Sequence, residues 1–139
     1  MPAVSENVID AVVTRLNAST FTTSFTASKR LFPRFQLENI SATVVDVFPG
    51  SVEYVKLDRA GSYLKTYEIK LVILSPLTAD NNAALSPFLL LAEEIKDDLA
   101  GQLMTGLPLV EIETDDAFNF DLVETAGLVT YQITLFYKG

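Results

Sequence analysis

The chain has 139 residues, of which 49% are hydrophobic, and its formal net charge at pH 7 is −8. This length suits one domain with a sizeable core, so we expect residues 1–139 to form a single domain. The sequence has no cysteine and no histidine, which excludes disulfides, thiolate or imidazole catalysis and the usual zinc ligands. The acidic excess argues against binding nucleic acid through its phosphates, because those contacts come from Lys and Arg.

The first predicted element is a helix over about residues 5–17. Ser5 is a candidate N-cap, and Glu6 suits the positive end of the helix dipole. Apolar side chains at helical spacing predict one buried face, made of Val8, Ile9, Val12, Val13 and Leu16.

Neither the N-terminal residues nor any later segment predicts export or membrane insertion. The first residues lack a basic segment followed by an apolar core, so we expect no signal peptide. The longest apolar runs, at 71–74 and 88–92, fall far short of the roughly 20 residues that a membrane span needs. We therefore expect a protein that is made and stays in a cytoplasm-like compartment.

Alternating apolar and polar residues predict three strands, over 42–48, 51–57 and 63–74. Pro49 and Gly50 are expected to turn the chain between the first two strands. The turn-forming residues 58–62 join the second and third strands, which predicts an antiparallel hairpin. The third strand has 12 residues, against a usual length of about 5–6, so this hairpin is expected to project beyond the sheet.

A second helix is predicted to begin with Ser86 as N-cap and Pro87 as first helical residue, and to end near Met104. Its expected apolar stripe consists of Phe88, Leu91, Ala92, Ile95, Leu99 and Leu103. Two last strands are predicted over 108–114 and 127–138. The linker between them carries Phe118 and Phe120, which are expected to fold back onto the core.

These elements predict an α+β fold with a mostly antiparallel sheet of four to six strands. Two main helices should pack on one face of the sheet, and the long hairpin should project from it. Period-two alternation places one set of side chains on a common face of each of the two longest strands: Tyr67, Ile69, Leu71 and Ile73, then Val129, Tyr131, Ile133, Leu135 and Tyr137.

Carboxylates are the main catalytic groups that the composition leaves. Glu93, Glu94, Asp97 and Asp98 fall on the polar side of the second predicted helix, where a solvated surface is expected. Residues 113–116 could hold a hard cation such as Mg²⁺ or Ca²⁺, but they lack EF-hand spacing. The glycines form no phosphate-binding loop. We therefore expect no enzymatic activity, no metal and no cofactor.

The segment "KRLFPRFQLENI" gathers apolar side chains around a proline: Leu31, Phe32 and Phe35 beside Pro33. The Ser- and Thr-rich residues 17–28 before it have weak β character. Because proline cannot donate to a sheet, a strand that enters this segment should end near Leu31 or Phe32. Leu31 is expected to turn inward. Phe35 is expected to pack on a neighbouring subunit, with Arg34 pairing an acidic group. The alternative is that Phe32 and Phe35 cap this chain's own core.

The order of motifs resembles the small neck and tail-completion proteins of tailed bacteriophages, particularly the tail terminators of long-tailed phages. The resemblance covers nearly the whole chain. It rests on an N-terminal helix, the basic–apolar segment, a hairpin, a second helix and a last strand: "VIDAVVTRLNAS", "KRLFPRFQLENI", "VVDVFPGSVEYVKLDRAGSYLKTYEIKLVI", "LLLAEEIKDDLAG" and "LVTYQITLFYK".

The resemblance implies a virion protein, made in the host bacterial cytoplasm, that assembles into a ring, expected to be a hexamer. The ring would cap the tail tube, stop its polymerisation and join the tail to the head–tail connector, while viral DNA passes through without specific binding. The expected subunit or partner interface comprises Phe32, Arg34, Phe35, Leu57, Arg59, Tyr63 and Phe136. A possible acidic lumen face comprises Glu93, Glu94, Asp97 and Asp98.

Two alternatives remain at the level of the sequence. The chain could be another phage neck component, a head–tail stopper or adaptor, because these proteins are similar in size. It could also be a small non-viral α+β binding module. Such a module would be monomeric or dimeric and would carry a concave pocket with a few convergent polar groups.

Overall fold

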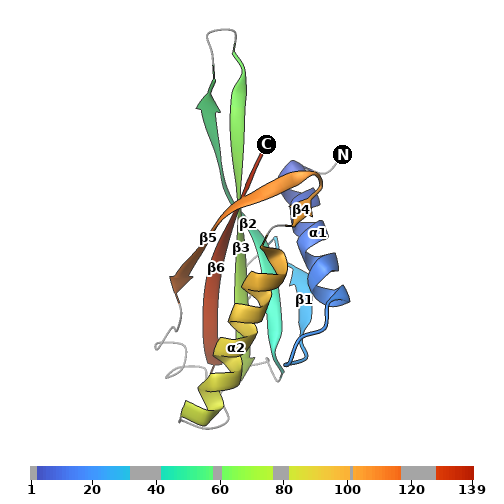
Figure 1. Ribbon diagram of the computed structural model, residues 1–139, viewed down its shortest axis with the longest axis vertical. Helices are drawn as coiled ribbons and strands as arrows, with labels where there is room; N and C mark the ends of the chain where they lie inside the picture. Colours follow the sequence, from blue (N-terminus) through green and yellow to red (C-terminus); the bar gives the residue numbers. More distant parts are fainter. Residues whose placement is uncertain (1–2, 32–41, 58–60, 77–81, 101, 117–127) are drawn as a thin grey trace.

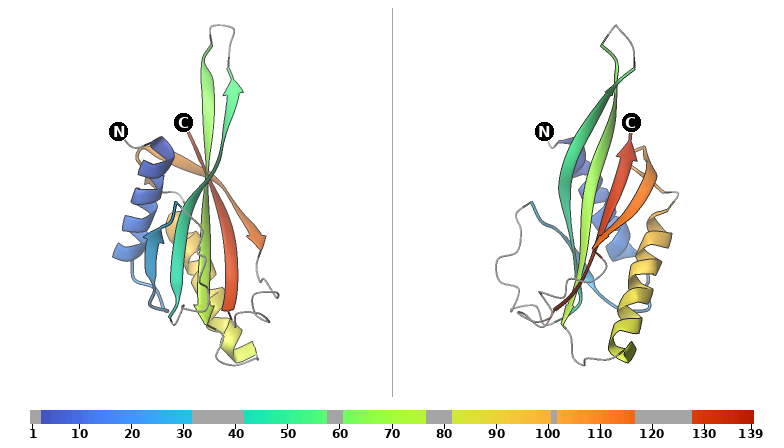
Figure 2. Two further views of the ribbon diagram at one scale, coloured as in Figure 1. Left: turned by 180° about the vertical axis from the view of Figure 1, so that it is seen from behind. Right: turned by 90° about the vertical axis from the view of Figure 1, so that its left-hand side faces the viewer.

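The computed structural model describes residues 3–31, 42–57, 61–76, 82–100, 102–116 and 128–139. The described elements are α1 (Val4–Ala18), β1 (Thr26–Lys29), β2 (Val44–Lys56), β3 (Tyr63–Pro76), α2 (Asn82–Leu99), β4 (Leu103–Met104), β5 (Leu107–Asp116) and β6 (Leu128–Lys138). The strands form one sheet in the order β1-β2-β3-β6-β5-β4. Both helices lie on the same face of this sheet (Figures 1 and 2). The predicted α+β class and two-helix layer are confirmed.

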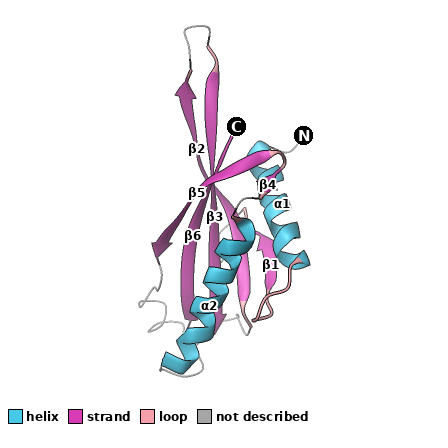
Figure 3. Cartoon of the chain, viewed as in Figure 1, coloured by secondary structure: helices cyan, strands magenta, loops and turns pink. Residues whose placement is uncertain are grey.

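The sheet is antiparallel apart from the pairing of β1 with β2 (Figure 3). After α1 the chain reverses direction, and β1 then runs beside β2 in the same direction. The side chain of Asn17 holds the return in place: its Nδ2 donates to the carbonyl of Ala27, and its Oδ1 accepts the Ala27 N–H, both at 3.0 Å. β1 is therefore attached to the end of α1 as well as to β2.

Three details of the N-terminal prediction are wrong. The N-cap of α1 is Ala3, which makes no side-chain capping bond, so Ser5 lies inside the first turn rather than at the cap. Leu31 is 53% exposed and does not turn inward. β1 ends at Lys29, earlier than expected, and the N–H of Arg30 makes the last bond to β2, at 2.9 Å from the Val47 carbonyl. Leu31 therefore follows the paired part of the strand.

The Pro49–Gly50 pair does not turn the chain, contrary to the sequence prediction. β2 runs through it as one 13-residue strand with an irregularity in register between Pro49 and Val52. Proline is tolerated here because β1 has already ended, so the missing N–H removes no bond to a strand on that side. A Cβ at Gly50 would lie 2.9 Å from the side chain of Glu68 on β3, so a larger residue here would have to displace that side chain.

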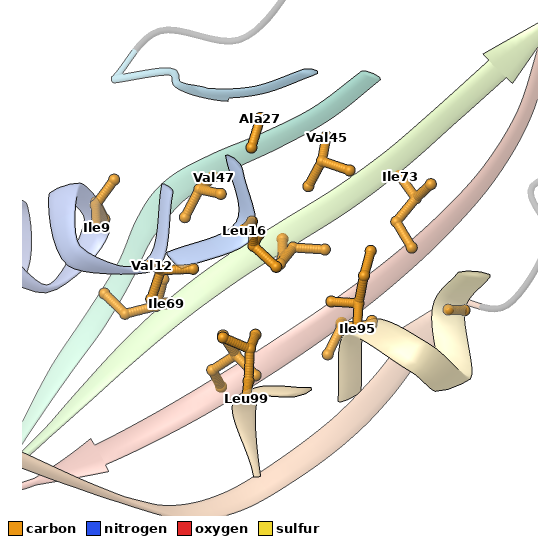
Figure 4. Close-up of a cluster of buried hydrophobic side chains, with 14 of the residues drawn as sticks. Ile9, Val12, Leu16, Ala27, Val45, Val47, Ile69, Ile73, Ile95 and Leu99 are labelled. Carbon is orange, nitrogen blue, oxygen red and sulfur yellow. The ribbon is translucent and has the colours of Figure 1, made fainter. Parts of the chain in front are cut away.

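The core lies between the helices and one face of the sheet (Figure 4). The alternation predicted for β3 and β6 is confirmed, with Ile69, Leu71, Ile133, Leu135 and Tyr137 fully buried. α1 contributes Val8, Ile9, Val12 and Leu16, and α2 contributes Phe88, Leu91, Ala92, Ile95 and Leu99. Each predicted stripe therefore faces the sheet, apart from the last residue predicted for α2.

The bounds of α2 differ from the prediction at both ends. The helix begins at Asn82, before Pro87, and ends at Leu99. Pro87 therefore lies inside the helix, where it donates no bond to the preceding turn, and it does not mark the helix start. Leu103 belongs to β4 and is exposed. β4 connects to β5 through Thr105 and Gly106, both with positive φ, a tight turn that the sequence analysis missed.

Candidate assembly interface

The β2–β3 hairpin continues beyond the rest of the sheet. The backbone of Lys65 pairs with Gly139, the last residue of the chain. Beyond this level, β2 and β3 pair only with each other within the described part of the chain. Figure 1 shows these two strands at the top, past both helices and the other strands. We call residues 53–57 and 62–65 the hairpin arm.

One face of the hairpin arm carries two tyrosines and two lysines. Tyr54 is paired across the strands with Lys65, and Lys56 with Tyr63, so the four side chains share a face. The tyrosine rings meet edge to face, 6.2 Å between centroids, and the Lys65 Nζ lies 5.4 Å from the Tyr54 ring centroid. Tyr54 is 59% and Tyr63 50% exposed. We call these four residues the arm face.

The opposite face of the arm is apolar and exposed as well. Val55 and Leu57 are both exposed there, and the N–H of Leu57 donates to the carbonyl of Ser62 at 2.8 Å. The arm therefore presents apolar side chains on both sides and has no helix covering either. Contiguous exposed apolar surface of this kind is typical of a contact with another molecule.

Phe136 lies on a different surface from the arm. It is half-buried on β6, opposite Glu68 of β3 and Glu111 of β5. Tyr63 precedes Glu68 on β3 by five residues, which corresponds to about 16 Å. The structure thus brings the predicted interface residues Leu57 and Tyr63 together in the arm, and leaves Phe136 on the body of the sheet.

The other predicted interface residues, Phe32, Arg34, Phe35 and Arg59, lie outside the described residues. The linker residues Phe118 and Phe120 lie outside them too. The role predicted for the segment around Pro33 stays a prediction.

Asp98, predicted to be a solvated residue, joins the two helices. Its carboxylate accepts bonds from Arg15 of α1, at 3.1 Å from Nε and 3.0 Å from Nη2. The Ser19 hydroxyl donates to it as well. The hydrogen bond and charge of Asp98 raise the pKa of Arg15 above its ordinary value. This carboxylate is therefore directed at its own chain.

The remaining three acidic residues predicted for a lumen face are not equivalent either. Glu94 accepts bonds from the backbone N–H and the hydroxyl of Thr22, the latter at 3.0 Å. Glu93 and Asp97 are exposed and form no ion pair among the residues that the structure describes. Two of the four carboxylates are therefore available to another molecule.

The exposed side of α2 carries apolar residues that sequence reasoning missed. Leu89 is 42% and Leu90 44% exposed, and both precede Glu93 and Asp97 on the outer side of the helix. The sequence already indicated this exposure, because at helical spacing Leu89 and Leu90 fall on a different face of the helix from the buried stripe. We call Leu89, Leu90, Glu93 and Asp97 the helix patch.

The hollow between α1 and β4, and the one beside the connection from α1 to β1, have little that would suit a small ligand. One hollow, about 430 Å³, is lined by Asp10, Ala11, Thr14, Arg15, Gln102, Leu103 and Met104. Its charged groups are already paired, since Asp10 lies 3.1 Å from Lys29 and Arg15 is bonded to Asp98. A smaller hollow, about 200 Å³, follows the connection from α1 to β1. Across the described ranges, no group of three His, Cys, Asp or Glu side chains could hold a metal.

Neither described helix combines the length and the apolar character that crossing a membrane requires.

No protein-family model matches the chain, and no curated protein matches it. Among solved structures, it is similar to a chain of the virion of a native gene transfer agent particle, with 16% identity, 100% of both chains covered and a TM-score of 0.57. It also matches a chain of the PVC sheath/tube terminator of an extracellular contractile injection system in the extended state. That match has 13% identity, covers 100% of this chain and 57% of the other, and has a TM-score of 0.35. The first likeness shows that this fold is shared, over its full length, with a chain of a virion.

Proposed function

We propose that the chain is a structural virion protein: a tail terminator that forms a ring, caps the tail tube, stops its polymerisation and joins the tail to the head–tail connector. The observation that carries this proposal is the full-length match of the fold to a chain of a gene transfer agent virion. The motif order that resembles phage tail terminators supports the same function from the sequence.

The arrangement of exposed surface supports assembly into a ring. A ring of identical subunits needs two different surfaces on each subunit, one for each neighbour. The chain exposes apolar side chains on the hairpin arm and, separately, on the outer side of α2. A monomeric binding module would not need an uncovered aromatic arm. We propose a hexamer as the number of subunits.

The charge of the chain supports passage of DNA without specific binding. With a net charge of −8, the surface of the ring would repel phosphate rather than hold it. The proposed partners are therefore further copies of the chain, the tail tube protein and the connector protein. The proposed location is the neck of the virion, after synthesis in the host bacterial cytoplasm. The function involves no catalysis and no cofactor.

A tube-length experiment tests the terminator function. The purified chain is added to polymerising tail tube protein, and tube lengths are measured by electron microscopy. We expect a narrowed length distribution with the chain located at one end of each tube. Tubes that grow to the same lengths with and without the chain would exclude a terminator. Binding to the connector with no effect on tubes would favour the stopper or adaptor alternative.

A variant with a shortened arm tests whether the arm takes part in assembly. Replacing residues 54–65 by a two-residue turn joins the paired residues Glu53 and Thr66, which removes the arm face and leaves every core residue of β2 and β3 in place. We expect a folded subunit, with unchanged far-UV circular dichroism, that no longer completes tails. If this variant still yields complete particles, the arm has no role in assembly.

A further inference from the structure

We infer that the arm face of one copy docks on the helix patch of a second copy of this chain, in a head-to-tail contact. This inference rests on the proposed ring-forming function and names the two surfaces that would form the ring.

The arm face is continuous with the core-facing side of the sheet, but no helix covers it. Along β3, Tyr63 and Lys65 continue the series of side chains that points toward the helices at Tyr67 and Ile69. On β2, Val52 packs partly against the core and precedes Tyr54 on the same face. Below the arm this face is covered by helices, and at the arm it is exposed (Figure 2). A helix from another molecule would complete the same layer.

The arm face also carries basic charge that no described residue of its own chain neutralises. Neither Lys56 nor Lys65 forms an ion pair with any residue in the described part of the chain. Lys65 lies over the Tyr54 ring, which favours a cation but leaves its charge uncompensated. In a chain of net charge −8, a basic aromatic surface is suited to an acidic partner.

The helix patch has the complementary composition. Leu89 and Leu90 supply exposed apolar side chains, and Glu93 and Asp97 supply carboxylates one and two turns further along α2. The tyrosines of the arm face would cover the leucines, and its lysines would meet the carboxylates. The spacings agree, because one helical turn of about 5.4 Å is close to two residues of a strand, about 6.6 Å.

The two surfaces cannot meet within one chain. Figure 1 shows the hairpin arm at one end of the long axis, while α2 begins at the opposite end, with its first turns furthest from the arm. A contact between arm face and helix patch therefore joins different copies, and each copy uses both surfaces. Such a heterologous contact repeats from copy to copy and closes into a ring where the rotation permits.

A charge swap tests the contact. The variant Lys56→Glu/Lys65→Glu makes the arm face acidic, and Glu93→Lys/Asp97→Lys makes the helix patch basic. Each variant alone sets like charges against each other, so we expect self-association to weaken at least about tenfold by sedimentation velocity. An equimolar mixture should associate again, because each acidic arm meets a basic patch and each basic arm meets an acidic patch. Self-association of either single variant at wild-type strength would overturn the inference.

Cysteine cross-linking locates the contact directly, because the chain has no cysteine of its own. Tyr63→Cys chains mixed with Leu90→Cys chains should form a disulfide-linked dimer under mild oxidation, and the double variant should form a ladder of multimers. Val110→Cys, on an exposed position of β5, is the matched control. Preferential cross-linking to the control, or no cross-linking either in solution or in assembled particles, would overturn the inference.

These outcomes can be distinguished from a failure of the proposed function. If tubes are capped normally but Tyr63 and Leu90 do not cross-link, the terminator function stands and the arm binds elsewhere, for example on the tube protein. If the cross-link forms but tubes are not capped, the head-to-tail contact stands and the terminator function falls.

Discussion

The carboxylate of Asp98 on α2 is held by both the Nε and the Nη2 of Arg15 on α1, at 3.1 and 3.0 Å. This two-bond contact fixes the ends of the two helices relative to each other above the sheet. Asp97, its neighbour in sequence, is exposed and makes no ion pair in the described ranges. Adjacent aspartates of the same helix therefore have different roles.

The first prediction compares these two residues. Asp98→Ala should lower the thermal unfolding midpoint, because it removes the acceptor for Arg15 and for the Ser19 hydroxyl. Asp97→Ala is the matched control and should unfold at the wild-type temperature. Differential scanning calorimetry of the two variants measures the difference. Equal midpoints would mean that the contact between Arg15 and Asp98 contributes nothing to stability.

The second prediction concerns Tyr137, whose hydroxyl is buried and makes no hydrogen bond among the described residues. Burial raises the pKa of this phenol far above its ordinary value of about 10. The unfolded chain therefore releases a proton that the folded chain keeps, so this group's contribution to stability falls as pH rises above about 10. Tyr137→Phe should be at least as stable as wild type at pH 7 and more stable above pH 10, by urea unfolding.

A variant that removes the whole ring of Tyr137 separates the effect of its packing from the effect of its hydroxyl. Tyr137→Ala should cost about 3–5 kcal/mol in free energy of unfolding, as for other buried aromatic side chains. A loss of more than about 1 kcal/mol in Tyr137→Phe would show that the hydroxyl has a partner.

The third prediction concerns acid stability and Glu68. The hydrogen bond that the Ser51 hydroxyl donates, and then the hydrogen bond from Lys70, lower the pKa of this carboxyl below its ordinary value of about 4.5. A lowered pKa contributes stability that is complete above the ordinary value and is lost as pH falls toward the folded-state value. Between about pH 5 and pH 3, wild type should therefore lose more stability than Glu68→Gln. Parallel losses in the two proteins would contradict this assignment.

The buried faces of the fold could be predicted from the sequence because burial imposes a period on it. Ile69, Leu71 and Ile73 alternate because one side of β3 faces the helices, and Leu91 and Ile95 recur at helical spacing for the same reason. These patterns depend on residues close together in the chain, so they can be recognised without knowing the fold.

The errors concern features that depend on distant residues. Pro49 and Gly50 favour a turn locally, but β1 stops before Pro49, and Glu68 of β3 occupies the space beside Gly50. Ser86 and Pro87 are typical of a helix start, yet α2 already begins at Asn82. At Pro49 and Gly50 the local signal was outweighed by contacts with distant residues.

The candidate interface was predictable in part. Leu57 and Tyr63 were expected there because the strand after the turn is longer than a sheet requires, and both are exposed on the arm. Leu89 and Leu90 were missed because they sit inside an apolar run that also contains buried residues. Assigning each residue of that run to a helix face would have separated them. Asp98 could not have been separated from Asp97 without the position of α1.

The last prediction tests whether the hairpin arm belongs to the core or to an interface. Replacing Tyr54 and Tyr63 by serine should cost less than about 1 kcal/mol in free energy of unfolding, because both rings are exposed and lose mainly their contact with each other. Ile69→Ala, on the same strand but fully buried, should cost about 2–5 kcal/mol. Urea unfolding followed by circular dichroism gives both values. At matched concentrations, only the tyrosine variant should lose self-association in analytical ultracentrifugation while retaining wild-type stability. A tyrosine variant as unstable as Ile69→Ala would show that the arm supports its own domain, and one that associates like wild type would show that the contact lies elsewhere.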